Sequence, residues 1–334
     1  QEVFMKPVSI NLALQGGGAH GAFTWGVLDR LLEESWIGFD GVSGTSAGAM
    51  NAVMLAEGWR LGGREGARKQ LEAFWLAVAS SDYSIRLPEQ LEGAVTRFWL
   101  HAMRYLSPYD VNLLDINPLE DLLQKQVCFE KLRQDSPFKL FIAATEVASG
   151  KLKLFNEREL DLPRLLASAC LPNIHKAIEI DGAYYWDGGF SGNPAVFPLI
   201  YECVADDVLI ILLQPLQQEN LPVSAEDIAG RVTELGFQST FMREMRAVSN
   251  IRKYSSGSRW RQGWAERRVN GMRCHIMESD PLLDGLSRSS KYDNSKQFLT
   301  SLKESGREAC DHWLHAHQGN LGKRESCDLQ GLFS

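Results

Sequence analysis

The sequence predicts a mixed α/β fold with a mostly parallel central sheet and helices on both faces. Two observations lead to this prediction. Apolar strand patterns and amphipathic helix patterns alternate through residues 8–213, an order that builds a parallel sheet between helical layers. Later in the chain long helical patterns dominate, at about 225–252 and 290–317, with one added strand predicted over 273–278. We therefore expect a first domain over 8–213 and a mainly helical C-terminal extension over 214–334.

The composition narrows the functional classes. The 334 residues are 44% hydrophobic, which suffices for a full buried core, and the net charge of -7 argues against a nucleic-acid binder. The six cysteines show neither a CxxC pair nor a metal-ligand spacing, so we expect reduced thiols in a cytoplasmic protein and no metal site. No apolar run reaches the length of a membrane-spanning helix, so any contact with a membrane is expected to be peripheral.

An apolar strand pattern at 8–14 leads at once into Gly16-Gly17-Gly18-Ala19-His20-Gly21 and then into a helix pattern. A glycine loop between a strand and a helix can bind an anion, because it exposes successive backbone N–H groups in front of the positive end of the helix dipole. The anion is either a phosphate group or the oxyanion that forms when a nucleophile attacks an ester carbonyl. The loop is a candidate site of either kind.

The phosphate alternative would make the protein a dinucleotide-binding enzyme. Gly16, Gly18 and Gly21 fit the GxGxxG pattern, and Asp40 follows at about the distance of a ribose-binding acid. However, three adjacent glycines are more than a dinucleotide turn requires, and the serine turn around Ser46 follows in place of a second mononucleotide half. Dinucleotide binding therefore stays an alternative.

The pentapeptide Gly44-Thr45-Ser46-Ala47-Gly48 lies between a strand pattern at 39–43 and a helix pattern of small residues at 47–56. A sharp turn from strand to helix can hold one side chain in a strained, exposed position, provided that glycines two residues before and after let the backbones pass closely. This arrangement is the nucleophile elbow. Ser46 is therefore the candidate nucleophile.

Residues 177–186 predict a β-hairpin with Asp181-Gly182 as its turn. Its second strand leads into Asp187-Gly188-Gly189, a carboxylate followed by two glycines where the chain has already turned. Such a position suits an aspartate that contacts another group closely, although a second Asx-type turn would give the same pattern. Asp187 is therefore a candidate functional carboxylate.

These three motifs, in this order, resemble those of the patatin-like phospholipases of the bacterial type. The family carries a glycine-rich oxyanion loop, a GxSxG elbow and a D-G-[GA] tripeptide, which correspond here to 16–21, 44–48 and 187–189. The resemblance extends from about residue 10 to residue 213. One departure is His20, which stands in the glycine loop where family members often carry Arg or Lys.

The resemblance implies a serine acyl hydrolase of lipid esters that acts in lipid degradation and needs no cofactor. Ser46 would be the nucleophile and Asp187 its base, and the backbone of Gly16, Gly17 and Gly18 would form the oxyanion hole. The other motif glycines are Gly21, Gly44, Gly48, Gly188 and Gly189. A serine hydroxyl needs a hydrogen-bonded base to take its proton, and a carboxylate is a useful base only when it is partly desolvated. We therefore expect Asp187 to be buried.

Two other interpretations concern the same residues. His275 lies late enough to complete a Ser, Asp, His order, although a buried core position also explains it. A catalytically silent lipid-binding protein of the same fold would keep the motifs without the reaction.

Two further segments have alternative roles. The aromatic, helical insertion at 63–118 either packs into the core or caps an acyl pocket, with Trp99 and Tyr105 at its entrance. Arginines and tryptophans between 243 and 268 form either a solvated face or a surface for anionic headgroups or a partner protein.

Overall fold

The computed structural model describes residues 6–80, 109, 117–218, 221–255, 262–279, 290–291 and 293–334. Most of the insertion predicted at 63–118, with Trp99 and Tyr105, lies outside the described residues. So does the segment 256–261 within the predicted Arg and Trp surface.

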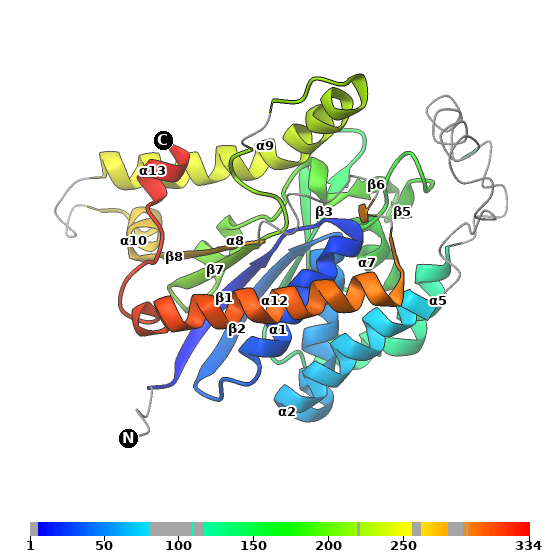
Figure 1. The fold of residues 1–334 in the computed structure, drawn as a ribbon, viewed down its shortest axis with the longest axis horizontal. Coiled ribbons are helices and arrows are strands. Elements are labelled where there is room, and N and C mark those ends of the chain that lie inside the picture. The colour runs from blue at the N-terminus through cyan, green and yellow to red at the C-terminus, as the bar shows by residue number, and fades with distance from the viewer. Residues whose placement is uncertain are drawn as a thin grey trace.

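One sheet of eight strands runs through the described part of the chain (Figure 1). The strands are β1 (Val8–Leu14), β2 (Ile37–Thr45), β3 (Lys139–Glu146), β4 (Leu152–Asn156), β5 (Ile178–Ile180), β6 (Ala183–Asp187), β7 (Asp207–Leu212) and β8 (Arg273–Glu278). Their order is β5-β6-β3-β2-β1-β7-β8, with β4 paired to β3 outside this path. The pairs β3–β2, β2–β1, β1–β7 and β7–β8 are parallel. The pairs β3–β4, β3–β6 and β5–β6 are antiparallel. The predicted sheet is confirmed.

The described helices are α1 (Gly21–Leu31), α2 (Ala47–Ser80), α5 (Pro118–Gln126), α6 (Phe129–Gln134), α7 (Leu162–Ser168), α8 (Phe197–Glu202), α9 (Ala225–Tyr254), α10 (Trp264–Gly271), α12 (Lys296–His317) and α13 (Leu329–Phe333). Short 3-10 turns stand at Gly18–His20, Gly188–Phe190 and Gln318–Asn320. None of these helices combines the length and the apolar character needed to cross a bilayer.

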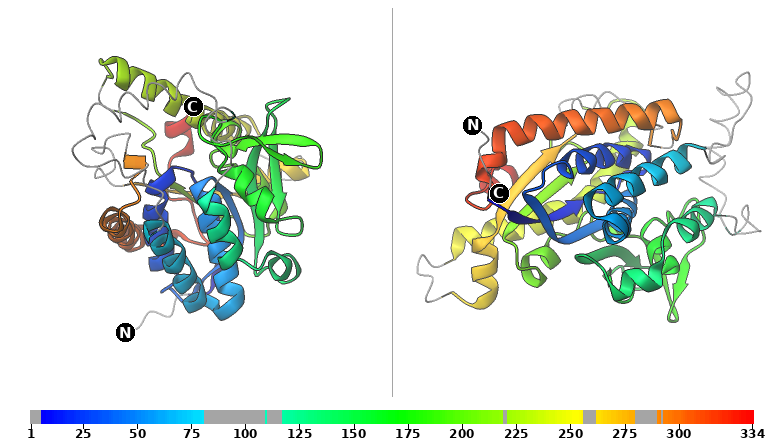
Figure 2. Two further views of the ribbon diagram at one scale, coloured as in Figure 1. Left: turned by 90° about the vertical axis from the view of Figure 1, so that its right-hand side faces the viewer. Right: turned by 90° about the horizontal axis from the view of Figure 1, so that it is seen from below.

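The helices cover both faces of the sheet (Figure 2). Strand side chains alternate between faces, so Leu12 and Leu14 join one buried core with residues of α1, α2 and α12. Ala13, between them, joins the other core, which contains residues of α8, α9, α10 and α13. The strand β7 is buried along its whole length, and this burial explains its unbroken run of apolar residues at 208–212.

Local sequence signals set several of these elements. At the β5–β6 turn, Asp181 has φ 52° and Gly182 has φ 82°, which confirms the predicted hairpin and its Asp-Gly turn. The helix predicted at 47–56 is the start of the longer α2, which is interrupted at Gly62 and Gly63.

The residues after 213 belong to the same sheet and the same cores. The predicted strand at 273–278 is present as β8, which pairs in parallel with β7. In α12, a Cβ at Gly306 would lie 2.0 Å from the Phe23 carbonyl oxygen, so α12 and α1 touch through their backbones. This helix begins at Lys296, later than the predicted 290, because Ser295 caps it by accepting a hydrogen bond from the Phe298 N–H. The C-terminal extension is mainly helical, but it shares its core with the first domain.

Candidate active site

Ser46 lies at the turn between β2 and α2, in a backbone conformation that is rare for a residue with a side chain. Its φ is 54°, in the left-handed region, which costs a non-glycine residue about 1–3 kcal/mol. Two hydrogen bonds hold the turn: the Thr45 hydroxyl donates to the Gly192 carbonyl at 2.6 Å, and the Met50 N–H donates to the Ser46 carbonyl at 3.1 Å. The turn therefore presents the Ser46 side chain at a strained, partly exposed point.

The two glycines of the elbow are required by close backbone contacts. A Cβ at Gly44 would lie 2.5 Å from the Gly48 carbonyl oxygen, and a Cβ at Gly48 would lie 2.2 Å from the Leu14 carbonyl oxygen. Real Cβ atoms do not approach backbone atoms so closely. The GxSxG spacing is thus explained by packing against β1 as well as by the turn itself.

Asp187, at the end of β6, lies close enough to Ser46 to interact with its hydroxyl. Its carboxylate accepts a hydrogen bond from the Gly189 N–H at 2.7 Å, and the nearby Ser46 hydroxyl also favours the ionised form. The side chain is only 1% exposed, and this burial raises the pKa of the Asp187 carboxyl to about 7, against the effect of these two neighbours. The structure therefore brings together the serine and the aspartate that the sequence singled out.

The glycines after Asp187 leave room for neighbouring elements. A Cβ at Gly188 would lie 2.3 Å from the Ala143 carbonyl oxygen on β3. At Gly189 it would meet the ring of Phe237, on α9, at 2.1 Å. The tripeptide is therefore enclosed between the sheet and a helix of the C-terminal extension.

The glycine loop packs directly against the Ser46 turn. A Cβ at Gly16 would lie 2.8 Å from the Thr45 carbonyl oxygen and 2.9 Å from the Ser46 Cβ. The Gly16 N–H donates to Asn193 Oδ1 at 2.8 Å, so this N–H is already used inside the protein. Within the described part of the chain, the N–H groups of Gly17 and Gly18 have no acceptor. Of the three predicted oxyanion donors, Gly16 is thus engaged elsewhere, while Gly17 and Gly18 stay candidates.

Two residues of the site were not among the predicted site residues. Ser168, buried at the end of α7, accepts a hydrogen bond from the Ser46 N–H at 3.0 Å and so steadies the elbow. Asn193 holds Gly16, as described above. The sequence signal for Ser168 was its stretch of small residues, which resembles the family, but that stretch does not indicate a contact with a residue 122 positions earlier.

A sequence model of the patatin-like phospholipases matches residues 12–200, more than half of the chain. The chain belongs to the patatin-like phospholipase family. No curated protein sequence matches the chain.

Solved structures of distant relatives resemble this chain. VipD from Legionella pneumophila is 16% identical with a TM-score of 0.45, over 94% of this chain and 67% of VipD. The type III effector protein ExoU is 17% identical with a TM-score of 0.38, over 93% of this chain and 53% of ExoU. ExoU bound to SpcU, from Pseudomonas aeruginosa, is 14% identical with a TM-score of 0.36, over 95% of this chain and 53% of that one. The chain spans about half the length of ExoU.

The glycine loop of this family member carries no fixed positive charge. His20 is 5% exposed, and burial, together with the nearby Lys291 ammonium, lowers the pKa of its imidazole to about 4. The ring is therefore neutral near neutral pH. The departure from the family pattern at His20 therefore leaves residues 16–21 without a charged side chain near neutral pH.

His275, the alternative base, is hydrogen-bonded elsewhere. It is fully buried on β8, where its ring nitrogens bond Asp207 Oδ1 at 3.0 Å and Ser326 Oγ at 2.9 Å. The Ser46 hydroxyl interacts with Asp187 instead. The structure assigns His275 to the core.

The structure does not favour the dinucleotide alternative. Asp40, the candidate ribose-binding acid, accepts hydrogen bonds from the backbone N–H groups of Val204 and Ala205. Its carboxylate is therefore used within the protein. Gly16 faces the Ser46 turn, and a Cβ at Gly18 would lie 2.6 Å from the Lys291 carbonyl oxygen, so protein atoms pack closely against both glycines. Among the described residues, no cluster of His, Cys, Asp or Glu could hold a metal ion.

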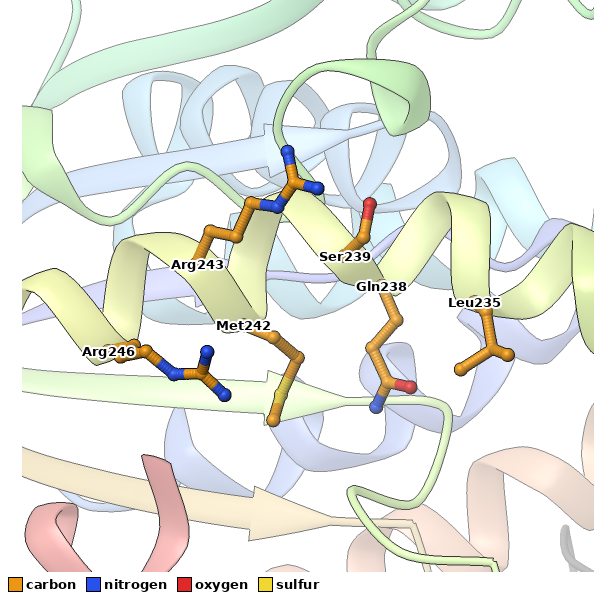
Figure 3. Close-up of a pocket in the computed structure, with 6 residues that line it drawn as sticks. All are labelled: Leu235, Gln238, Ser239, Met242, Arg243 and Arg246. Carbon is orange, nitrogen blue, oxygen red and sulfur yellow. The ribbon is translucent and has the colours of Figure 1, made fainter. Parts of the chain in front are cut away.

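The described part of the chain has two notable pockets. One, of about 290 Å³, is on α9 and is lined by Leu235, Gln238, Ser239, Met242, Arg243 and Arg246 (Figure 3). The other, of about 460 Å³, is at the β5–β6 hairpin, and Tyr109, Tyr184 and Trp186 are among its lining residues. Neither is lined by Ser46 or Asp187.

Proposed function

We propose that this chain hydrolyses acyl esters of lipids, with Ser46 as nucleophile and Asp187 as its base. The observation that supports this most is that the Ser46 hydroxyl, at a strained turn, interacts with the buried Asp187 carboxyl and lowers its pKa. A desolvated carboxylate with a pKa near 7 is a far better base than aspartate in water. Family membership supports a lipid acyl ester as the substrate.

The reaction has two symmetrical halves. As Ser46 Oγ attacks the ester carbonyl carbon, its proton passes to Asp187 and the carbonyl oxygen becomes an oxyanion. The carbon–oxygen bond to the leaving alcohol then breaks, and Asp187 returns the proton to that alcohol. Water then attacks the acyl-enzyme and gives its proton to Asp187, which passes that proton to Ser46 Oγ as the fatty acid leaves.

The oxyanion is the group that the glycine loop stabilises. The N–H groups of Gly17 and Gly18 have no acceptor in the described part of the chain, and the loop lies against the Ser46 Cβ. Donors that are in place before the reaction stabilise the developing charge without reorganising.

A catalytically silent lipid-binding protein explains the site less well. The left-handed φ of Ser46 and the buried carboxylate of Asp187 both reduce folding stability, and neither is needed to hold a lipid. An active hydrolase requires both features.

Labelling with a fluorophosphonate tests the proposal directly. This probe reacts only with an activated serine, so we expect one modified residue, Ser46, in mass spectra of the digested protein. A silent binding protein would stay unlabelled. Complete labelling at another serine, or none at all, would contradict the proposed function.

We further propose that the enzyme reaches its substrate at a lipid surface, through an apolar stripe on α9. Ile228, Val232 and Leu235 lie on successive turns of this helix and are 46%, 64% and 48% exposed. Farther along the same helix, Phe237 fills the space at Gly189, next to Asp187. Phe237 lies on the opposite side of the helix from the stripe, so α9 borders the site with one face and exposes the apolar stripe on the other. The exposed face is suited to lie on a membrane.

Val232→Asn should separate binding at an interface from chemistry. We expect about tenfold slower turnover of phosphatidylcholine vesicles, because an exposed valine that enters lipid contributes on the order of 1.5 kcal/mol. Turnover of a soluble short-chain ester should be unchanged. Val204→Asn is the matched control, since Val204 is 83% exposed just before β7, at the opposite end of the parallel strands from Ser46. Equal vesicle rates in the two variants would contradict the role of the stripe.

A further inference from the structure

Residues 290–291 of the C-terminal extension lie directly on the glycine loop. Gly18 has φ 59°, and a Cβ there would lie 2.6 Å from the Lys291 carbonyl oxygen. Only glycine fits both the backbone conformation and the close contact. The loop that offers the N–H groups of Gly17 and Gly18 is therefore shaped by a segment from the far end of the chain.

One hydrogen bond secures this contact. His20 Nε2 and Ser290 Oγ are 2.7 Å apart, although the two residues are 270 positions apart in the sequence. The His20 ring is almost fully buried and also packs against Phe298 of α12, with 6.3 Å between ring centroids. Because His20 immediately precedes α1, the bond holds the point at which the glycine loop becomes a helix.

We propose that Ser290 is a positioning residue for the oxyanion hole, acting through its hydrogen bond to His20. This inference rests on the proposed function. An oxyanion hole is effective because its donors already point at the place where charge develops. His20 lies two residues after Gly18, so a ring without its partner leaves the loop backbone less restrained. The N–H groups would then have to be reoriented during the reaction.

Residues 290–291 also contact α9, the helix that covers the turn at Asp187. Lys291 Nζ lies 3.6 Å from Glu234 Oε1 on α9. The next turn of α9 provides Phe237, whose ring fills the space beside Gly189 and lies 4.6 Å from the Phe190 ring. Residues 290–291 thus connect the oxyanion loop to the helix that encloses the Asp187 turn.

A matched control exists at the other end of the extension. Ser326 Oγ bonds His275 Nδ1 at 2.9 Å, so it also ties a serine of the C-terminal extension to a buried histidine. His275 lies on β8, which β7 separates from β1, and its ring bonds Asp207 and Ser326 and not the glycine loop. Ser326→Ala removes the same kind of bond without touching the loop.

The experiment compares Ser290→Ala, Ser290→Thr and Ser326→Ala with the wild type. The readouts are kcat and KM for a soluble short-chain ester, and the rate of fluorophosphonate labelling at Ser46. For Ser290→Ala we expect kcat and the labelling rate to fall about tenfold, less than the 10²–10³-fold expected for loss of an oxyanion donor. KM should stay unchanged. Ser290→Thr keeps the hydroxyl and should restore kcat, and Ser326→Ala should leave kcat at the wild-type value.

Three results would overturn the positioning role: a wild-type kcat in Ser290→Ala, a Ser290→Thr variant as slow as the alanine variant, or an equal loss of kcat in Ser326→Ala. The last two would show that only folding stability had been measured. Labelling of the wild type separates this failure from that of the proposed function. An unlabelled Ser46 refutes the hydrolase itself, whereas a labelled Ser46 with an unaffected Ser290→Ala refutes only the role of Ser290.

Discussion

Ser46→Ala is expected to lower ester hydrolysis by on the order of 10⁴–10⁶-fold, because the variant has no atom that can attack the carbonyl carbon. The remaining rate would come from the oxyanion hole and from substrate binding. Folding stability should change little. Alanine meets the same strain as serine at φ 54°, and the backbone bond from the Ser46 N–H to Ser168 Oγ is kept. Activity on a soluble ester and the thermal unfolding midpoint are the two measurements.

Ser43→Ala is the control for this prediction. Ser43 lies on β2, three residues before Ser46, is fully buried, and its hydroxyl has no partner among the described residues. Its removal tests whether any serine loss in this strand reduces activity through packing. Ser43→Ala should keep near wild-type activity. If Ser46→Ala hydrolysed the ester at more than about a tenth of the wild-type rate, Ser46 could not be the nucleophile.

The sequence was most informative where a function depends on neighbouring residues. The elbow needs glycines two positions before and after Ser46, because both make close backbone contacts. This requirement appears in the sequence as the pentapeptide at 44–48. Likewise, the Asp181-Gly182 turn specifies the hairpin that delivers Asp187 to the end of β6. Each of these patterns spans only a few consecutive residues, so it can be recognised in one sequence.

The sequence was least informative where the site depends on distant residues. Ser168, Asn193 and Ser290 contact the elbow and the glycine loop from 122, 177 and 270 positions away. A serine or asparagine in a loop has no local pattern that names its partner. The use of the Gly16 N–H by Asn193 was hidden for the same reason.

The boundary expected at residue 213 was also drawn on a local signal. The change to long helices there is real, but β8 and α12 return to the sheet and to α1. The backbone contact of Gly306 with α1 shows how closely α12 packs. A glycine inside a predicted helix was the available clue to that packing, because glycine weakens a helix unless something must come close to it.

Asp187→Asn is expected to abolish most activity while making the folded protein more stable at pH 8. The amide keeps the shape and can accept the Gly189 N–H, but it cannot take the Ser46 proton, so we expect a loss on the order of 10³–10⁴-fold. The wild type needs the ionised carboxylate. Its kcat/KM should therefore fall as the pH drops below about 7, the raised pKa of Asp187.

The sign of the stability change follows from the same pKa. Burial raises the pKa of Asp187 from 3.8 to about 7, so between these values the folded protein holds a proton that the unfolded chain has lost. Wild-type stability therefore decreases as the pH rises from about 4 to about 7 and stays low above that. An asparagine side chain does not titrate, so the variant lacks this pH-dependent loss of stability. The unfolding midpoint of Asp187→Asn should exceed that of the wild type clearly at pH 8 and much less at pH 5.

Glu244→Gln separates this stability effect from the chemistry. Glu244, on α9, accepts backbone hydrogen bonds from Val196 and Phe197, and burial raises the pKa of its carboxyl to about 7 as well. The glutamine variant should gain stability with the same pH dependence yet keep its activity, because Glu244 is not bonded to Ser46. A stability gain in Asp187→Asn that is equal at pH 5 and pH 8 would show that the carboxylate is not buried in its charged form. If Asp187→Asn kept wild-type activity, the base would have to be another group.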